Sequence, residues 1–336
     1  MDTCLLFSFY AHAKLLDYSF FDIGKSRNYY DQKASTEIFK EQYQKAFKPA
    51  LTTIFAFVKE QGQVNLAFTG YFLEQWQKTD PECLQLLREQ VEEGTIELMG
   101  TTYHHSIASL FSPDLFQLEA TQQAKLVKKL FGVSPKTFFN TEGIFYNDLG
   151  DLLVKQGYTA VVTEALPWYL NNHSPHQLFL SATKGLSILL NADFAHGEKS
   201  EVRVKHFDVP RGYLQVEKIL KDHSVKNSLI STHEALLKYK AVHGYNVPMP
   251  IGHNSERHFS YFSENAMQKE AIAKLKQLVN TAKEKNPELL FEIAAFARLE
   301  FFMTMNYKGL SSLSGQPYDF YIAFMNILSD FEIKHF

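Results

Sequence analysis

Cysteine is scarce in this chain of 336 residues, which contains only Cys4 and Cys83. The two lie far apart, and Cys4 falls in an apolar run that is typical of a buried strand. Disulfide-rich domains and cysteine-based zinc sites need more cysteines at closer spacing. The sequence therefore argues against a disulfide framework and against a structural zinc site.

Long apolar runs and an excess of basic charge are also missing. No run approaches the ~20 apolar residues that a membrane-spanning helix needs. The chain has 34 Lys and Arg against 37 Asp and Glu, a net charge of −3, and no basic tract that would contact nucleic acid. The start, Met1–Thr3, carries an acid instead of a basic stretch, and the apolar run after it is too short for a signal peptide. We therefore expect a cytoplasmic protein with neither a membrane nor a nucleic-acid partner.

Common cofactor and nucleophile motifs are absent as well. The sequence contains no GxGxxG, Walker A or GxSxG stretch, which removes the usual dinucleotide, nucleoside triphosphate and serine hydrolase signals. Its 45% hydrophobic residues can bury a sizeable core in one large α/β domain, or in one domain with a helical appendage. The 29 Phe and 17 Tyr either fill that core or offer platforms for sugar rings, and composition alone does not choose.

Short β-branched or aromatic runs alternate with helical patterns along most of the chain. This alternation predicts a parallel sheet joined by crossover helices. The predicted strands are Cys4–Phe9, Val64–Thr69, Thr95–Met99, Thr137–Asn140, Ala160–Thr163, Leu186–Leu190, Val202–Phe207 and Ser228–Ser231.

Helix ends are clearest at two places. Asp80 can cap a helix that begins at Pro81 and stops before Gly94, and a second helix runs from Pro113 to just before Gly132. From about residue 254 helical periodicity continues with few strand signals. This C-terminal helical region is predicted over Ser263–Lys285, Pro287–Tyr307 and Pro317–Phe331.

Polar residues follow the ends of most predicted strands. His12 follows the first strand, His105 the third and Glu142 the fourth. In a β/α barrel or an open α/β sheet the carboxyl ends of the strands converge on the ligand site. Such a distribution is typical of an active-site rim, although polar residues also simply begin loops.

Glu142 comes just after a predicted strand, between Asn140 and Tyr146. A carboxylate held there by hydrogen bonds stays ionised and can act as a nucleophile. A helix cap or an exposed charge is the alternative interpretation.

Tyr103, His104 and His105 leave another predicted strand together. Neighbouring residues on an extended segment point to opposite sides, so at most one of the two imidazoles faces a given ligand. A metal site needs three or four convergent ligands, and no HxH or HExxH spacing is present, so we predict no metal. A hydrogen bond to a sugar hydroxyl and a structural role both remain open.

Taken in order, these segments resemble glycoside hydrolase family 57, and within it the α-amylase or α-amylase-like branch. The resemblance covers nearly the whole chain. The matching stretches are Tyr18–Gly24, Tyr29–Asp31, Phe72–Gln75, Gly94–Leu98, Thr102–Leu110, Phe139–Asn147, Val247–Ile251, Glu256–Arg257, Asn265–Gln268, Pro317–Asp319 and Phe324–Phe331.

The resemblance implies an incomplete (β/α)7 barrel, similar to a TIM barrel, over residues 1–250, and a C-terminal helical region over residues 251–336. It implies action on α-glucans or maltooligosaccharides with retention, by a Glu nucleophile and an Asp acid/base about 5–5.5 Å apart, without a cofactor. Glu142 falls on the family nucleophile. Tyr103 and His105 fall in the strand-end region that contacts substrate.

The sequence departs from the family pattern in two motifs. Tyr10 stands where the family has a sugar-contacting His, and His12 follows it as a further candidate for substrate contact. The acid/base motif has no clean counterpart, and its nearest candidate is Val204–Val209. Alignment without gaps places His206 on the acid/base and Asp208 on the following Glu. A slip of two residues makes Asp208 the acid and keeps the same strand face.

Two hypotheses follow from the resemblance and its departures. In the first, the protein is an α-glucan hydrolase or transglycosylase that uses Glu142 and Asp208, and His206 or Asp193 compensates in part for the altered motif. His206 is also a predicted substrate contact. In the second, it is a catalytically impaired relative that binds α-glucan or a partner enzyme. Trp168 is either a stacking platform for sugar or part of the packing. The position of Asp208 relative to Glu142 distinguishes the two hypotheses.

Overall fold

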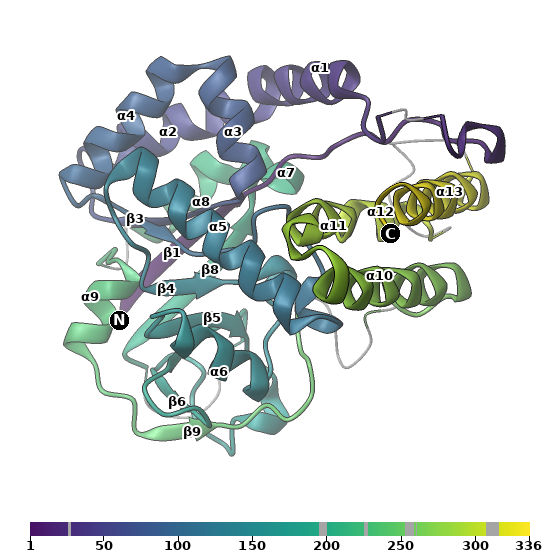
Figure 1. The fold of residues 1–336 in the computed structure, drawn as a ribbon. Coiled ribbons are helices and arrows are strands. Elements are labelled where there is room, and N and C mark those ends of the chain that lie inside the picture. Colours follow the sequence, from purple (N-terminus) through teal and green to yellow (C-terminus); the bar gives the residue numbers. More distant parts are fainter. Residues whose placement is uncertain (26–27, 195–199, 225–227, 253–258, 260, 307–315) are drawn as a thin grey trace. The chain divides into compact units, whose positions relative to one another are not determined.

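The computed structural model describes the chain except residues 26–27, 195–199, 225–227, 253–258, 260 and 307–315 (Figure 1). Contacts divide it into two units. The barrel unit comprises Met1–Tyr10, Lys40–Tyr103 and Ala120–Glu256. The helical unit comprises Ala11–Phe39, His104–Glu119 and Arg257–Phe336. A helix long and apolar enough to cross a membrane is not found among the described residues.

The barrel unit is built on parallel strands in the order β3-β2-β1-β8-β7-β5-β4. These strands are β1 (Asp2–Phe9), β2 (Val64–Phe68), β3 (Ile96–Met99), β4 (Thr137–Phe139), β5 (Ala160–Glu164), β7 (Ser187–Asn191) and β8 (Val202–Asp208).

The two outer strands of this order meet at Gly100. Its N–H donates to the carbonyl of Thr137 at 2.9 Å, and its carbonyl accepts from the N–H of Phe139 at 2.8 Å. Gly100 and Phe138 thus form a parallel bridge between the end of β3 and β4. Within the described residues, the bridge closes these seven parallel strands into a barrel.

The barrel interior is apolar. Side chains from alternate positions of each strand meet there, among them Leu6, Val162, Leu189 and Val204, all essentially inaccessible to solvent. β1 and β2 are buried along their whole length, as expected for parallel strands that are covered on both faces.

Seven of the predicted strands are confirmed within one or two residues at their ends. The prediction of an eighth strand at Ser228–Ser231 is wrong. Leu229 makes an isolated parallel bridge to Thr3, with one hydrogen bond on each side, and pairing does not extend beyond it. Two short strands were not predicted. These are β6 (Phe179–Ser181), antiparallel to β7, and β9 (His243–Tyr245), parallel to β6.

Helices connect most of the strands (Figure 1). Those of the barrel unit are α2 (Lys48–Val58), α3 (Gly70–Thr79), α4 (Pro81–Glu92), α6 (Asn147–Lys155), α7 (Val209–Gly212), α8 (Val216–Ser224) and α9 (Thr232–Lys238). Two more helices, α1 (Gln32–Gln42) and α5 (Pro113–Phe131), each have residues in both units.

Short helical turns lie between these elements and in the helical unit. They are η1 (Phe20–Asp22), η2 (Tyr43–Phe47), η3 (Ala108–Leu110), η4 (Thr141–Gly143), η5 (Pro167–Tyr169), η6 (Tyr213–Gln215) and η7 (Pro287–Leu289).

The predicted ends of α4 and α5 are confirmed. Asp80 accepts a hydrogen bond from the N–H of Cys83 at 3.0 Å, which satisfies a free donor of the first turn of α4. Gly94 and Gly132, which follow the two helices, have φ of +75° and +76°. Glycine adopts these left-handed angles at little cost, so both helices stop where the sequence indicates.

The C-terminal helices of the helical unit are α10 (Ala266–Lys285), α11 (Leu290–Phe296), α12 (Leu299–Thr304) and α13 (Pro317–His335). The predicted continuous helical stretch after Pro287 is interrupted between α11 and α12, and its predicted end at Tyr307 lies outside the described residues. The interruption arises because Arg298 pairs with Ser106 in an antiparallel bridge, which requires extended backbone.

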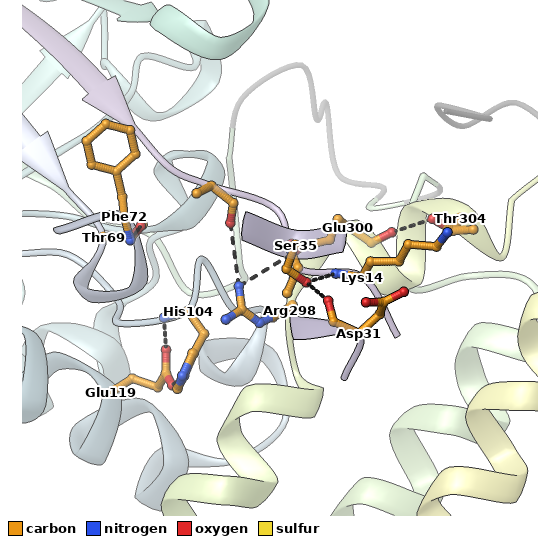
Figure 2. A network of polar contacts seen from close by, with 12 residues as sticks. Lys14, Asp31, Ser35, Thr69, Phe72, His104, Glu119, Arg298, Glu300 and Thr304 are labelled. Atoms are coloured by element: carbon orange, nitrogen blue, oxygen red, sulfur yellow. Dashed lines mark hydrogen bonds and ion pairs between the residues drawn. The ribbon is translucent and has the colours of Figure 1, made fainter. Parts of the chain in front are cut away.

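Buried ionic groups tie the start of α12 to the N-terminal segment of the same unit (Figure 2). The carboxylate of Glu300 accepts from the N–H of Ala13 at 3.2 Å and from Nη1 of Arg298 at 3.5 Å. Arg298 also donates to the carbonyl of Ala11. Both charged side chains are at most 4% exposed, so each compensates the other inside the unit.

Candidate active site

Three strand ends of the barrel unit carry the site. Tyr10 directly follows β1, Glu142 lies in η4 just after β4, and Asp208 is the last residue of β8. β1 and β8 are neighbours with Ser8 opposite Asp208, whereas β7 and β5 separate β8 from β4. A contact between Glu142 and Asp208 therefore has to span the mouth of the barrel.

Glu142 sits in an unusual backbone conformation. Its φ of 52° and ψ of 25° lie in the left-handed region, which costs a residue with a side chain roughly 1–3 kcal/mol. Neighbouring side chains hold the turn in place: Asn140 accepts from the N–H of Thr141 at 2.9 Å and donates to the carbonyl of Ile144 at 3.0 Å. Thr163 of β5 donates to the carbonyl of Gly143 at 2.8 Å. The fold thus enforces a strained residue at a strand end, a feature that clusters at functional sites.

The guanidinium of Arg211 joins the two candidate catalytic carboxylates. Nη1 and Nη2 donate to the two carboxylate oxygens of Glu142, both at 3.1 Å. Nε lies 3.3 Å from Oδ2 of Asp208. Because one planar group contacts both acids, Glu142 and Asp208 meet at one place in the barrel mouth.

Asp208 receives several hydrogen bonds. Its Oδ2 accepts from the hydroxyl of Tyr10 at 3.0 Å, and its Oδ1 accepts from the backbone N–H of Arg211 at 3.3 Å, as the N-cap of α7. The side chains of Glu142 and Asp208 are 12% and 16% exposed. Donors and a nearby cation stabilise the ionised form of a carboxylate.

The electrostatic environment shifts two other groups of this cluster. Burial, together with the charge of Asp208, raises the pKa of Tyr10 well above its usual value, so its hydroxyl keeps the proton that it donates. Burial opposes the charged form of Arg211, but Tyr10, Glu142 and Asp208 outweigh this effect and raise the pKa of the guanidinium. Arg211 is therefore a permanent cation between the two acids.

His206 lies on the same face of β8 as Asp208, two residues earlier. Its Nε2 is 2.8 Å from Oγ of Ser8, and its ring packs against Phe139 with centroids 4.4 Å apart. Its backbone N–H donates to Asn191. Asp208 is the residue of β8 that shares Arg211 with Glu142, which favours the alignment with the two-residue slip.

The remaining predicted substrate residues are distributed over both units. In the barrel unit, Tyr103 is buried against Gly70 at the start of α3, and Trp168 lies in η5 with 41% of its surface exposed. His12 and His105 belong to the helical unit. His105 is buried in a left-handed conformation with φ of 54°, and its carbonyl accepts from the N–H of Leu299.

Arg211 was not among the predicted site residues. The signal that could have found it is the spacing Asp208-Val-Pro-Arg211. An acid followed two residues later by Pro is typical of a helix N-cap, and the first helical turn then brings the third residue after the acid close to its carboxylate. The contact with Glu142, 69 residues away in sequence, could not be inferred in this way.

The described part of the chain contains no group of three or more His, Cys, Asp or Glu side chains arranged to hold a metal ion. The polar groups that the structure brings together at the barrel mouth are two carboxylates, a tyrosine hydroxyl and a guanidinium.

The chain is similar to known proteins in sequence and in fold. The model of glycosyl hydrolase family 57 matches residues 9–194. A protein of Methanocaldococcus jannaschii named "Putative alpha-amylase" is 25% identical over 367 residues, which cover 90% of this chain and 78% of that protein.

Several solved structures share the fold. A GH57-type branching enzyme from Pyrococcus horikoshii superposes with a TM-score of 0.70 at 12% identity and covers 98% of this chain and 88% of its own. A 4-alpha-glucanotransferase from Thermococcus litoralis gives a TM-score of 0.65 at 14% identity over 88% of this chain. The chain spans only 53% of that enzyme. The mixed α/β fold with its parallel barrel and C-terminal helices is thus the fold of these proteins.

Proposed function

Because the chain belongs to glycoside hydrolase family 57, a family of α-glucan-acting enzymes, we propose that it cleaves α-glucosidic bonds with retention, by hydrolysis or transfer. Glu142 acts as the nucleophile and Asp208 as the general acid/base. The observation that carries this proposal is the contact of both carboxylates with one guanidinium, that of Arg211. It supports the close approach of two acids that a retaining mechanism requires.

The proposed reaction has two steps. Glu142 attacks the anomeric carbon while Asp208 transfers a proton to the departing glycosidic oxygen, which leaves a glycosyl ester on Glu142. Asp208 then takes a proton from water, or from the hydroxyl of an acceptor sugar, as that oxygen attacks the anomeric carbon and releases Glu142. Asp208 loses one proton in the first step and regains one in the second, so the two side chains return to their starting state.

A second candidate function is glucan or partner-enzyme binding without turnover. The observation that favours it is the set of donors on Asp208, from Tyr10 and Arg211, which stabilise the ionised form of the group. A general acid has to carry a proton in the first step, so these donors oppose that role in the free protein.

Reducing-end release and the change in chain lengths of the products, both measured on maltoheptaose and amylose with the wild type and Glu142→Gln, test both candidates. Chain lengths are needed because transfer leaves the number of reducing ends unchanged. Turnover by the wild type that is lost in Glu142→Gln supports the retaining enzyme. An ester adduct on the Glu142 peptide of the wild type, detected by mass spectrometry, supports it further. Calorimetry with maltoheptaose on the same samples completes the experiment. Binding without turnover in the wild type would contradict the enzyme and establish the second candidate.

A further inference from the structure

We propose that Arg211 is a positioning residue of this site: it orients the Glu142 carboxylate for attack and couples that carboxylate to Asp208. The inference rests on the proposed function, because it assigns a role within the same reaction. Arg211 lies in α7, which is labelled in Figure 1 and begins at the residue after the end of β8.

The geometry of the pair leaves the nucleophile able to react. Each carboxylate oxygen has two lone pairs, and the two bonds from Arg211 to Glu142, at 3.1 Å each, use one on each oxygen. The second lone pair of either oxygen stays available to a carbon. Paired donors from one planar group also fix the rotation of the carboxylate plane, which a single donor does not.

Asp208 holds Arg211 at two places, the backbone and the guanidinium. Its backbone N–H donates to Oδ1 of Asp208, and its Nε lies 3.3 Å from Oδ2 of the same residue. Pro210, at the second position of α7, restricts the backbone just before it. The direction of the guanidinium is thus set by the acid on β8, and the guanidinium in turn sets the direction of Glu142.

This arrangement makes the two acids interdependent. A proton arriving on Asp208 removes the negative charge that attracts Nε, whereas ionised Asp208 and ionised Glu142 share the positive charge of Arg211. Loss of the guanidinium leaves two like charges facing each other, which disfavours ionisation of both.

The other titratable groups at the site come from three strand ends. Tyr10 contacts Asp208 from β1, His206 precedes it on β8, and Glu164 at the end of β5 approaches Gly143, the residue after Glu142. None of these side chains is altered by a substitution at Arg211, so the change in charge is confined to one group.

The first consequence concerns the pH profile of kcat/KM. Its acidic limb follows the nucleophile, which has to be ionised, and its alkaline limb follows the acid, which has to be protonated. In Arg211→Gln both limbs should therefore move to higher pH, by roughly 1 pH unit. This is the lower end of the shift that a neighbouring charge causes, because the guanidinium is partly exposed to solvent. A purely structural role would lower the profile without moving it.

The experiment compares wild type, Arg211→Gln, Arg211→Lys and Lys218→Gln on maltoheptaose from pH 4 to 9. Lys218 is an exposed cation of α8 and serves as the matched loss of one positive charge. We expect kcat of Arg211→Gln to fall at least about tenfold with little change in KM, with the shifted profile. Arg211→Lys keeps the positive charge but not the paired donors of the guanidinium. The limbs of its pH profile should therefore lie where they do in the wild type, while only part of kcat is restored.

Guanidinium chloride at a few millimolar, far below denaturing concentrations, should restore part of the activity of Arg211→Ala, and thermal melting checks that each variant folds. If a glutamine variant does not fold, Arg211→Lys supplies the test through its rate. A wild-type rate and pH profile in Arg211→Gln would overturn the proposal while the enzyme function stands. So would a loss of rate in Arg211→Gln that is equal at every pH, together with an Arg211→Ala variant that guanidinium does not reactivate. Absence of turnover in the wild type would overturn both.

Discussion

Arg211 forms a paired contact with Glu142 in which two guanidinium nitrogens each donate to a different carboxylate oxygen at 3.1 Å. The two residues come from the ends of β8 and β4, which the sheet order separates by β7 and β5. The pair therefore spans the barrel mouth, where the strand ends of this fold gather polar groups. With Asp208 on the other edge of the same guanidinium, it defines the candidate site.

Asp208→Asn should separate the acid role from substrate binding. The amide keeps the shape of the side chain but transfers no proton, so kcat on maltoheptaose should fall by about 10²–10⁴-fold. With α-maltotriosyl fluoride as substrate, the first step should slow much less, because fluoride leaves without protonation. Initial rates of sugar release from maltoheptaose and of fluoride release from the fluoride measure the two losses. Asp222→Asn, at an exposed position of α8, is the control, and equal losses on the two substrates would show that Asp208 is not the acid.

Gly70→Ala should destabilise the barrel unit. A Cβ at this position would lie 2.2 Å from Cδ2 of Tyr103, so the ring has to move out of a buried place. Overpacking of this kind costs about 1–3 kcal/mol of the free energy of unfolding. Urea unfolding followed by circular dichroism measures it. At Gly244 a Cβ meets no atom within 4 Å, so Gly244→Ala should change stability by less than about 0.5 kcal/mol.

Tyr43→Phe should also destabilise the protein. The Tyr43 hydroxyl accepts from Nε1 of the buried Trp76 and donates to Oδ2 of Asp80, both at 3.0 Å. Its removal takes the acceptor of a fully buried indole, at a cost of about 1–3 kcal/mol. Tyr318→Phe, at a side chain that is 55% exposed, is the matched control. Equal midpoints of urea unfolding in the two variants would contradict the prediction.

The stability of the protein should fall on mild acidification because of His176. Burial, with added repulsion from Arg203 and Lys205, lowers the pKa of this imidazole to about 4 in the folded state. The unfolded chain binds a proton near pH 6.5, so between about pH 6.5 and 4 it holds more protons than the folded chain. Stability therefore decreases as pH falls through that window, by about 1–3 kcal/mol in all.

His176→Asn should flatten this dependence. Free energies of unfolding in urea at pH 7.5 and pH 5 should differ less in the variant than in the wild type. His233→Gln changes an exposed histidine of α9 and should keep the wild-type difference. If His176→Asn keeps the full wild-type difference in free energy of unfolding between the two pH values, the prediction is wrong and other groups cause the acid sensitivity.

Local sequence signals account for much of the fold. Alternating short apolar runs and helical patterns predicted seven strands of the barrel, and Asp80 and Gly94 predicted both ends of α4. The position of Glu142 just after a strand made it a candidate, and the resemblance to the family assigned it the role of nucleophile. Each of these features depends on residues within a few positions of one another, where backbone preferences and capping act.

Short-range signals in the sequence thus account for the elements, their order and the polar groups at the strand ends. The tertiary structure alone decided that Gly100 bridges Phe138 and closes the barrel, and that Leu229 makes a single bridge where a strand was predicted. It alone placed Arg211 between Glu142 and Asp208. These contacts join residues far apart in the chain, and their energies depend on the register and closure of the whole sheet, which no local pattern encodes.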